Sequence, residues 1–262
     1  MDRFDRQPRA FHHKPHGHSH HGHPHPPTGP ERLRSGRREI RVVRRVLDVN
    51  DQLARQNREH FAAHGLFVLN VMSSPGSGKT TLLQKTIPKL MPDIRAAVIV
   101  GDICTTNDAD RLAESGAPVV QINTDEFGGD CHLAAHVVAS AAEGIDLDAV
   151  DLLIVENVGN LVCPAEFDIG EDARAVVLSV TEGEDKPLKY PLMFRECDAA
   201  VLNKTDLLPY LDFDCGEAVD NIRRIHPGMP VFELSAKSGE GLDAWIEWIR
   251  SQVTARHNGV KP

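Results

Sequence analysis

The sequence predicts an α/β fold in which helices cover both faces of a mostly parallel sheet. Two observations lead to this fold class. After residue 65, short apolar runs of the kind that form buried strands alternate with helical segments, and parallel strands need such crossover connections. In addition, a glycine-rich turn joins the first apolar run directly to a helical segment. The 262 residues are enough for one such domain with a sizeable core after a disordered start.

Residues 1–36 are expected to form a disordered, His-rich tail. Apart from proline, the stretch from His12 to Pro27 has no apolar residue whose burial could offset the entropy of ordering. It contains eight histidines, and because imidazole is a common ligand of transition metals we expect the tail to bind metal. A purification tag or an incidental polar tail is the alternative interpretation. The histidines are His12, His13, His16, His18, His20, His21, His23 and His25.

Residues 37–262 are expected to form the folded domain, which begins with a helix over residues 37–65. In that helix the apolar residues recur near helical spacing, the arginines fall mostly on the opposite, solvated face, and Gly65 provides a stop. A basic helix that binds a membrane or RNA is the alternative. The apolar positions are Ile40, Val43, Val46, Leu47 and Leu53.

The rest of the domain is predicted from runs of Val, Ile, Leu and Ala that are bounded by polar or turn residues. The expected strands are residues 66–74, 95–102, 117–123, 151–157, 175–181, 198–204 and 230–236. The expected helices are residues 80–90, 131–142 and 241–253. In such a sheet the ligand crevice lies beyond the carboxyl ends of the strands, so residues at those ends are the ones to inspect.

Charge and composition exclude several classes of function. A net charge of −9 argues against nonspecific nucleic-acid binding. The first ten residues lack the apolar region of a secretory signal, and the longest apolar runs are too short to span a bilayer. Five cysteines without the spacing of a small disulfide-linked domain suit a reducing compartment. We therefore expect a cytoplasmic protein without nucleic-acid or membrane partners.

The segment SSPGSGKT, Ser73 to Thr80, matches the phosphate-binding loop G-x-x-x-x-G-K-[ST], except that serine replaces the first glycine. The two remaining glycines let backbone N–H groups turn toward phosphate oxygens, and the following helix N-terminus assists them. Lys79 is expected to neutralise charge on the β- and γ-phosphates, and the Thr80 hydroxyl to hold Mg²⁺. The fold class is therefore that of a P-loop NTPase. The expected nucleotide contacts are Gly76, Ser77, Gly78, Lys79, Thr80 and Thr81.

Two acids, Asp102 and Glu156, end two of the expected strands. Because phosphoryl transfer depends on positioning and charge neutralisation, either acid could hold Mg²⁺ or orient the attacking water, with Lys79 as the third catalytic candidate. The sequence does not divide the two roles between them, and a helix cap or a turn residue is the alternative. No arginine finger is evident, so slow turnover is expected.

The segment N-K-x-D predicts that the base is guanine. A carboxylate at Asp206 can accept hydrogen bonds from both N1–H and the 2-amino group of guanine, which adenine does not offer. Asn203 could bond the N7/O6 edge, and the Lys204 stem could cover a ring face. Backbone N–H groups of Ser235, Ala236 and Lys237 could donate to O6. The sequence therefore predicts hydrolysis of GTP to GDP and phosphate, with a nucleotide-dependent small-molecule kinase as the alternative.

A second group of residues has the chemistry of a soft metal site. Cys131 and His132 are adjacent at the start of an expected helix, where a thiolate is favoured, and Cys163 follows Glu156 by seven residues. Two thiolates and an imidazole suit Zn²⁺ or Ni²⁺ and leave a coordination position open, so the metal could be exchangeable or shared between two chains. Each of these residues alone would more often be structural.

Six motifs together resemble the HypB family of hydrogenase nickel-incorporation GTPases: MSSPGSGKTTLL, GDICTTNDADRL, CH, ENVGNLVCPAEFD, TEGEDKPLKYP and LNKTDLLP. The resemblance implies a GTP-dependent homodimer of the P-loop class that includes the signal-recognition and nitrogenase-iron-protein GTPases (the SIMIBI class). It implies that Cys131, His132 and Cys163 bind Ni²⁺ or Zn²⁺ near the dimer interface. It also implies delivery of nickel, with a HypA-type partner, to the large subunit of a [NiFe] hydrogenase.

The chain departs from that family pattern at its N-terminus. Some relatives carry an N-terminal C-x-x-C-G-C nickel motif, whereas this chain has no cysteine before Cys104. The His-rich tail stands in its place, and many weak imidazole ligands suit storage of nickel. The alternatives are a urease accessory GTPase, whose metal motif is typically C-P-H, and a nickel-storage protein with vestigial GTPase activity.

Deletion of His12 to His25 should lower the number of Ni²⁺ ions bound per chain and leave GTP hydrolysis intact, because no nucleotide motif lies in the deleted segment. Equilibrium dialysis with Ni²⁺ and a phosphate-release assay on the same preparations measure both quantities. Full nickel capacity in the deleted protein would show that the tail is not a nickel store.

Overall fold

The computed structural model of the chain describes residues 31–102, 107–123 and 132–259, with side chains described from residue 46 onward and not for Asp102 or Asn107. The eight tail histidines and Cys131 lie outside these residues. Two compact units divide the chain, residues 1–42 and residues 43–262. Among the described helices, none is both long enough and apolar enough to cross a membrane.

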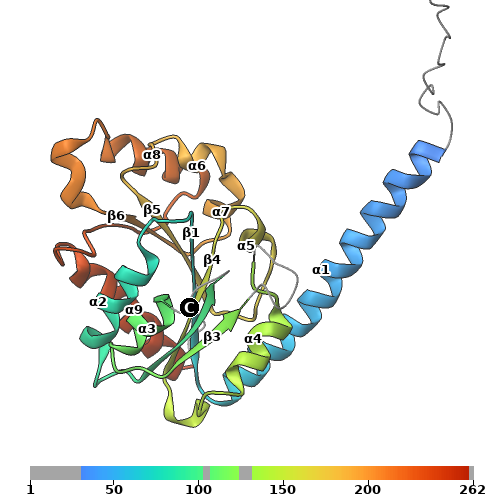
Figure 1. Cartoon of the computed structure of the whole chain (residues 1–262), viewed down its shortest axis with the longest axis horizontal. Coiled ribbons are helices and arrows are strands. Elements are labelled where there is room, and N and C mark those ends of the chain that lie inside the picture. The colour runs from blue at the N-terminus through green and yellow to red at the C-terminus, as the bar shows by residue number, and fades with distance from the viewer. Residues whose placement is uncertain (1–30, 103–106, 124–131, 260–262) are drawn as a thin grey trace, which may run out of the picture. The chain divides into compact units, whose positions relative to one another are not determined.

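In the described chain, seven strands form one parallel sheet in the order β3-β2-β4-β1-β5-β6-β7. Figure 1 shows this sheet with helices around it. Each corresponds to one of the predicted strands, so the predicted fold class is confirmed. Because all strands run in one direction, their carboxyl ends meet at one edge of the sheet. The strands are β1 (Phe67–Ser73), β2 (Ala96–Asp102), β3 (Val119–Asn123), β4 (Leu152–Gly159), β5 (Ala173–Ser179), β6 (Ala199–Asn203) and β7 (Val231–Glu233).

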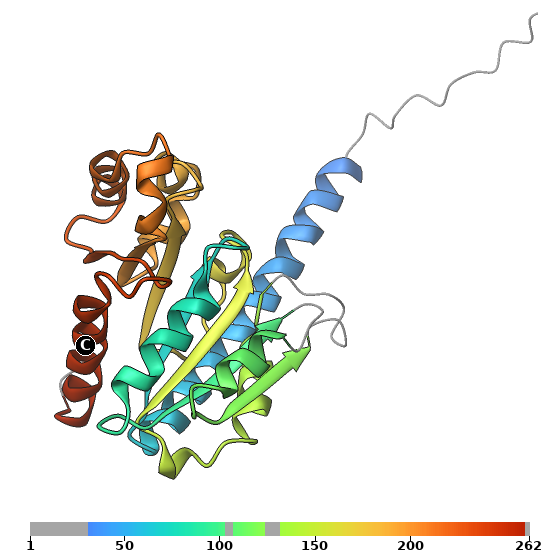
Figure 2. The same cartoon turned by 60° about the vertical axis from the view of Figure 1, so that its left-hand side comes forward.

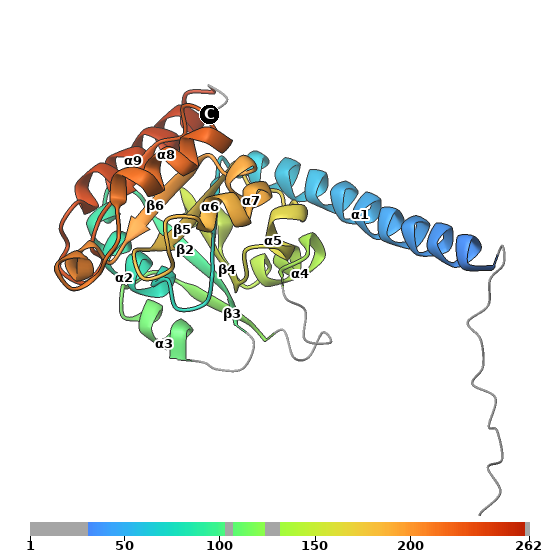
Figure 3. The same ribbon diagram turned by 90° about the horizontal axis from the view of Figure 1, so that it is seen from above.

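Helices cover both faces of the sheet (Figures 2 and 3). The reason is that the apolar side chains of each strand alternate between the two faces and are buried on both. One face packs against α2 (Lys79–Leu90), α3 (Asn107–Ala113) and α9 (Leu242–His257). On the other face, the end of α1 (Glu31–Ala63) and α4 (Ala135–Ala142) cover β1 to β4. The same face of β5 and β6 packs against α5 (Cys163–Glu166), α7 (Pro191–Arg195) and α8 (Cys215–Ile225). The remaining described elements are η2 (Leu147–Ala149), α6 (Lys186–Lys189) and η3 (Thr205–Tyr210).

Strand β1 lies at the centre of the sheet and is buried along its whole length. It pairs with β4 on one side and β5 on the other, with Val71 opposite Glu156 and, after a register shift, Ser73 opposite Gly159. This pairing brings the turn that follows β1 next to the carboxyl end of β4. The phosphate loop, which follows β1, and the segment ENVGNLVCP, which begins in β4, therefore lie next to each other.

Two predicted helix starts differ from the structure. The first helix begins at Glu31, six residues before the expected position. The helix expected over residues 131–142 begins only at Ala135, so His132 precedes it and does not lie in its first turn. The reason is tertiary: the Leu133 N–H donates to the Asn157 side chain at 3.3 Å and the Ala135 N–H donates to the Asn50 side chain at 3.0 Å.

Helix α8 was not predicted, although its start carries a recognisable signal. Asp214 is its N-cap, and the Asp214 carboxylate accepts a hydrogen bond from the Glu217 N–H at 3.1 Å. An acidic cap with glutamate at the third helical position is a common N-terminal pattern. The short helices α3, α5, α6 and α7 were also not predicted, and four to seven residues are too few to show a helical period.

Candidate functional site

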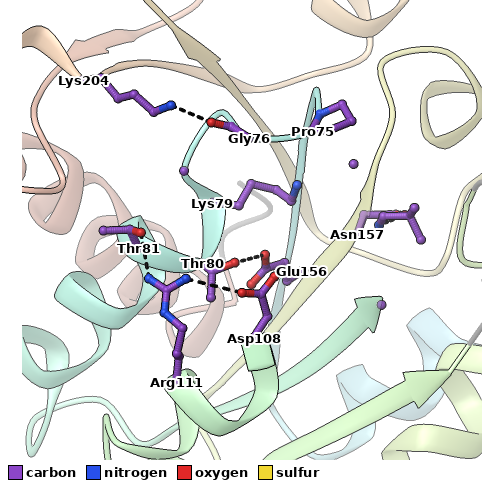
Figure 4. Close-up of a pocket in the computed structure, with 14 residues that line it drawn as sticks. Pro75, Gly76, Lys79, Thr80, Thr81, Asp108, Arg111, Glu156, Asn157 and Lys204 are labelled. Carbon is purple, nitrogen blue, oxygen red and sulfur yellow. Dashed lines mark hydrogen bonds and ion pairs between the residues drawn. The ribbon is translucent and has the colours of Figure 1, made fainter. Parts of the chain in front are cut away.

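The phosphate loop occupies the turn between β1 and α2. Gly76 and Gly78 have φ values of +74° and +98°, in the left-handed region that favours glycine. At Gly78 a Cβ atom would also lie 2.6 Å from the Asn203 side-chain nitrogen. Both the backbone conformation and the lack of space therefore require glycine at this position. Helix α2 begins at Lys79, and its N-terminus faces a cleft of about 500 Å³ (Figure 4). A helix N-terminus with inward-facing N–H groups is suited to bind phosphate.

Ser73, the departure from the usual loop motif, is fully buried and has a definite role. Its Oγ accepts a hydrogen bond from the Lys79 ammonium at 2.8 Å and donates to the Ser74 carbonyl at 2.6 Å. The hydroxyl therefore holds the lysine head at the floor of the loop. The next residue, Ser74, donates to the Glu182 carboxylate, and this contact attaches the loop to the segment that follows β5.

Glu156 was expected to end its strand, but β4 continues for three more residues to Gly159 because it pairs with β1 as far as Ser73. Glu156 is only 3% exposed and lies beside the first turn of α2. One carboxylate oxygen accepts a hydrogen bond from the Thr80 hydroxyl at 2.7 Å, and the other has no hydrogen-bond partner among the described residues. Burial raises the pKa of Glu156 to about 7, against the opposing effects of the Lys79 charge and the Thr80 hydrogen bond. A hydroxyl and a carboxylate with a free oxygen are hard donors that fit Mg²⁺.

Asp102, the other candidate acid, is the last residue of β2. Strand β2 pairs with β4, and Val100 lies opposite Glu156. The Asp102 backbone therefore lies two residues further along the neighbouring strand, at the same edge of the sheet. Because its side chain is outside the description, the structure does not divide the roles of the two acids.

A second pocket, of about 340 Å³, joins the two predicted base-binding segments. Its lining includes Asn203, Lys204, Asp206, Ala236 and Lys237. It also shares Gly78, Thr81 and Lys204 with the phosphate cleft. The structure therefore places the two pockets side by side, as one nucleotide would require.

The Asp206 carboxylate is held in place from one side. Its Oδ1 accepts a hydrogen bond from the Ser235 hydroxyl at 2.6 Å, and that hydroxyl oxygen accepts from the Ser238 N–H at 3.1 Å. Across the pocket, Lys204 has the left-handed φ of +67° and its ammonium donates to the Gly76 carbonyl at 2.6 Å. The Lys204 stem consequently passes between the phosphate loop and the base pocket.

Asn203 lines the base pocket, where its contact with the base stays a prediction, and it also has a structural role that was not expected. It is 1% exposed, and its side-chain nitrogen donates to the Ser77 carbonyl at 2.9 Å. Its Oδ1 accepts from the N–H groups of Lys204 at 2.7 Å and Ala236 at 3.0 Å. Asn203 therefore braces the phosphate loop against the S-A-K segment.

Two of the three backbone N–H groups expected to donate to the guanine O6 already have partners within the chain. The Ala236 N–H donates to Asn203, and the Ser235 N–H donates to the Glu240 carbonyl at 2.9 Å. Of the three expected donors, only the Lys237 N–H is without such a partner among the described residues.

The structure describes two of the three predicted metal ligands. The His132 ring stacks on Phe167, with ring centroids 3.7 Å apart, and Phe167 directly follows α5, which begins at Cys163. His132 therefore lies against the end of the helix that Cys163 begins. Among the described residues no group of three His, Cys, Asp or Glu side chains is arranged to hold a metal, and Cys131 lies outside that set. The three-residue ligand set stays a prediction.

A buried asparagine, which the sequence analysis did not single out, links the two candidate sites. Asn157 is next to Glu156 and lines the phosphate cleft. Its Oδ1 accepts from the N–H groups of Leu133, at 3.3 Å, and Val158, at 2.9 Å. Its nitrogen donates to the Asn70 side chain on β1 at 3.2 Å. The segment that follows His132 is therefore tied to the floor of the cleft.

Residues 67–233 match the family model described as the CobW/HypB/UreG nucleotide-binding domain. The chain is 51% identical over 221 residues to the hydrogenase maturation factor HypB of Escherichia coli K12, covering 84% of this chain and 75% of that protein. It is 41% identical over 212 residues to a probable hydrogenase maturation factor HypB of Methanocaldococcus jannaschii, covering 81% and 95%.

Two solved structures share the fold. The crystal structure of HypB from Helicobacter pylori in complex with nickel aligns with a TM-score of 0.74 at 37% identity, covering 79% of this chain and 96% of that one. The crystal structure of the hydrogenase maturation factor HypB from Archaeoglobus fulgidus aligns with a TM-score of 0.73 at 35% identity, covering 79% and 99%.

The buried Glu156 carboxyl should make the metal-free protein less stable as pH rises. Its pKa is about 7 in the folded chain and 4.5 when unperturbed, so between these values the folded state holds a proton that the unfolded state has lost. The free energy of unfolding should therefore fall by roughly 3 kcal/mol from pH 4.5 to pH 7 and then level off. Glu156→Gln should lose this fall, as measured by urea unfolding in EDTA. Exposed Glu143→Gln is the control, and a fall unchanged in Glu156→Gln would contradict the assignment.

Asp206→Asn should change the preferred base from guanine to xanthine. The new carboxamide cannot accept from both guanine donors, and its NH₂ group can donate to the 2-oxo group of xanthine. GTP affinity should fall by about 10²–10⁴-fold and XTP affinity should rise, as measured by calorimetric titration. Asp212→Asn, an exposed change outside the pocket, is the control. An unchanged preference for GTP would mean that Asp206 does not contact the base.

Proposed function

The chain belongs to the CobW/HypB/UreG family, among the hydrogenase maturation factors HypB, and on that premise we propose that it is a GTP-hydrolysing nickel metallochaperone for [NiFe] hydrogenase maturation. The observation that carries this proposal is the position of Glu156 and Asn157 in the carboxyl half of β4. There a nucleotide cleft and the segments of the predicted metal site share one strand end.

Guanine preference is supported by how firmly Asp206 is held. Its carboxylate is oriented by Ser235, and the pocket around it is braced by Asn203. A preorganised acceptor of this kind discriminates strongly between guanine and adenine, because an adenine base would leave a partly buried carboxylate without hydrogen-bond donors.

For hydrolysis, we assign Lys79, Thr80 and Glu156 to the phosphate chain. Lys79 is held by Ser73 at the floor of the loop, where its positive charge would neutralise negative charge on the β- and γ-phosphates. Thr80 and Glu156 would hold Mg²⁺, which supplies further charge neutralisation when bound. Asp102, at the end of neighbouring β2, is then the acid for orienting water. Because Glu156 and Lys79 are buried together, electrostatic interactions between charged groups in the cleft are stronger than they would be in water.

For nickel, we propose Cys131, His132 and Cys163 as the ligands, with Zn²⁺ as an alternative occupant. Two thiolates and one imidazole suit these ions, and a related chain from Helicobacter pylori was crystallised with nickel. We further propose that the site is completed in a homodimer, and that a HypA-type chaperone and the hydrogenase large subunit are the partners. The eight tail histidines would store nickel for this site.

The nucleotide should control the metal site through the end of β4. Glu156 is predicted to lie beside the bound Mg²⁺, and the chain reaches Cys163 seven residues later. Asn157, between them, also holds the N–H of the residue after His132. A loop that orders around the γ-phosphate and relaxes after hydrolysis would therefore move both ligands together.

We expect Ni²⁺ affinity to differ between the GDP state and the state with a non-hydrolysable GTP analogue by about 5- to 150-fold, the usual allosteric range. By linkage, Ni²⁺ should change nucleotide affinity by the same factor. Competitive chelator titrations of the tail-deleted protein measure the difference. Cys163→Ala should abolish it and leave GTP binding intact.

Cys215→Ala, which changes another partly buried cysteine, is the matched control and should preserve the coupling. GTP hydrolysis that is lost in Lys79→Ala would exclude a storage protein with a vestigial GTPase. Equal Ni²⁺ affinity in both nucleotide states of the wild-type protein would contradict nucleotide control of this site.

A further inference from the structure

Arg111, on α3, reaches into the phosphate cleft (Figure 4). One terminal nitrogen donates to the Thr81 hydroxyl at 2.9 Å, and the other lies 3.4 Å from the Asp108 carboxylate. The sequence contains Arg111 in the motif GDICTTNDADRL, one of the six that carry the family resemblance, but gave this arginine no role of its own, since it lies 30 residues beyond Thr81 in the chain. The structure makes it one of three cations that line the described part of the cleft, with Lys79 and Lys204.

The contact with Thr81 locates Arg111 along the nucleotide. Thr81 lines both the phosphate cleft and the base pocket, so it lies where the two meet. In loops of this type the backbone surrounds the α- and β-phosphates, and the lysine reaches the β- and γ-phosphates. Lys79 is held by Ser73 on β1, whereas Arg111 approaches from α3 on the other side of Thr80 (Figure 4). Arg111 therefore lies toward the α- and β-phosphates.

The chemistry of the side chain fits a phosphate ligand. A guanidinium has five N–H donors in a fixed plane, and two of them are directed at Thr81 and Asp108, which leaves three. The side chain is 44% exposed, so it is accessible to a ligand. An exposed ion pair of this length contributes little to stability and can be exchanged for phosphate oxygens at low cost.

The charges around Arg111 also favour a role in phosphate binding. Asp108 and Glu156 are two carboxylates in one cleft, and Asp108 raises the pKa of Glu156 whereas Arg111 lowers it, both as smaller effects than burial. A polyanionic nucleotide entering beside two carboxylates needs compensating positive charge on that side of the cleft. Among the described residues, Arg111 is the cation on α3 that supplies it.

We propose that Arg111 binds the α- and β-phosphates of the guanine nucleotide, contributing equally to GTP and GDP binding. This inference rests on the proposed function, since it concerns the same nucleotide site. A ligand to those phosphates makes the same contact in the ground state and the transition state. Its loss should therefore raise KM and leave kcat nearly unchanged. A ligand to the γ-phosphate would instead affect GTP more than GDP.

The experiment compares wild type, Arg111→Ala, Arg111→Lys and the control Arg95→Ala. Arg95 is exposed and ion-paired with Asp151, but it does not line the cleft. Calorimetric titration with GTP analogue, GDP and ATP, thermal unfolding without nucleotide, and steady-state GTP hydrolysis are measured for each.

Arg111→Ala should weaken GTP analogue and GDP by the same factor, about 10- to 100-fold, as expected for a charge-assisted hydrogen bond. Arg111→Lys should recover part of the loss, and Arg95→Ala should show none. Wild-type affinity in Arg111→Ala, a loss confined to GTP, or a fall in kcat at constant KM would overturn the inference. A different result would show that the proposed function itself is wrong: the wild-type protein would have no preference for the GTP analogue over ATP.

Discussion

Burial of β1 between β4 and β5 determines where each candidate residue lies. Because β1 is covered on both faces and paired on both edges, the turn after Ser73 can leave the sheet only at its carboxyl edge. The same edge carries Asp102 and Asn203, which end β2 and β6, and the carboxyl half of β4 with Glu156. A parallel sheet thus collects residues that are more than 100 positions apart in the chain. No single strand end would make a site alone.

Asn203 and Asn157 convert this proximity into a defined geometry. Each carboxamide is buried and makes hydrogen bonds to segments from different parts of the chain. Leaving such a buried group unpaired costs about 1–3 kcal/mol, so the segments that it joins are held together strongly. Asn203 joins the phosphate loop to the base pocket, and Asn157 joins the phosphate cleft to the segment after His132. The phosphate cleft and the segment after His132 therefore lie at one edge of the sheet.

The electrostatics of the cleft suit a charged ligand with a cation. Without one, a buried carboxylate at Glu156 is costly, which is why its pKa rises to about 7. Thr80 satisfies one carboxylate oxygen, and Lys79 and Arg111 supply positive charge on either side. The Mg²⁺ that we propose for Thr80 and Glu156 would reduce the cost of keeping this carboxylate ionised in the cleft.

The strands, the phosphate loop and the N-K-x-D and S-A-K segments were all predictable from the sequence, because each depends on neighbouring residues. Strand runs, the glycines that need a positive φ, and short motifs are local patterns, and all seven predicted strands are present. The start of α4, the bracing role of Asn203, the position of Arg111 and the link through Asn157 were not predictable. Each depends on which distant segment lies opposite, and a side chain such as Asn203 has the same local sequence whether it contacts a base or the Ser77 carbonyl. Only the packing of the sheet edge determines which partner is within hydrogen-bond distance.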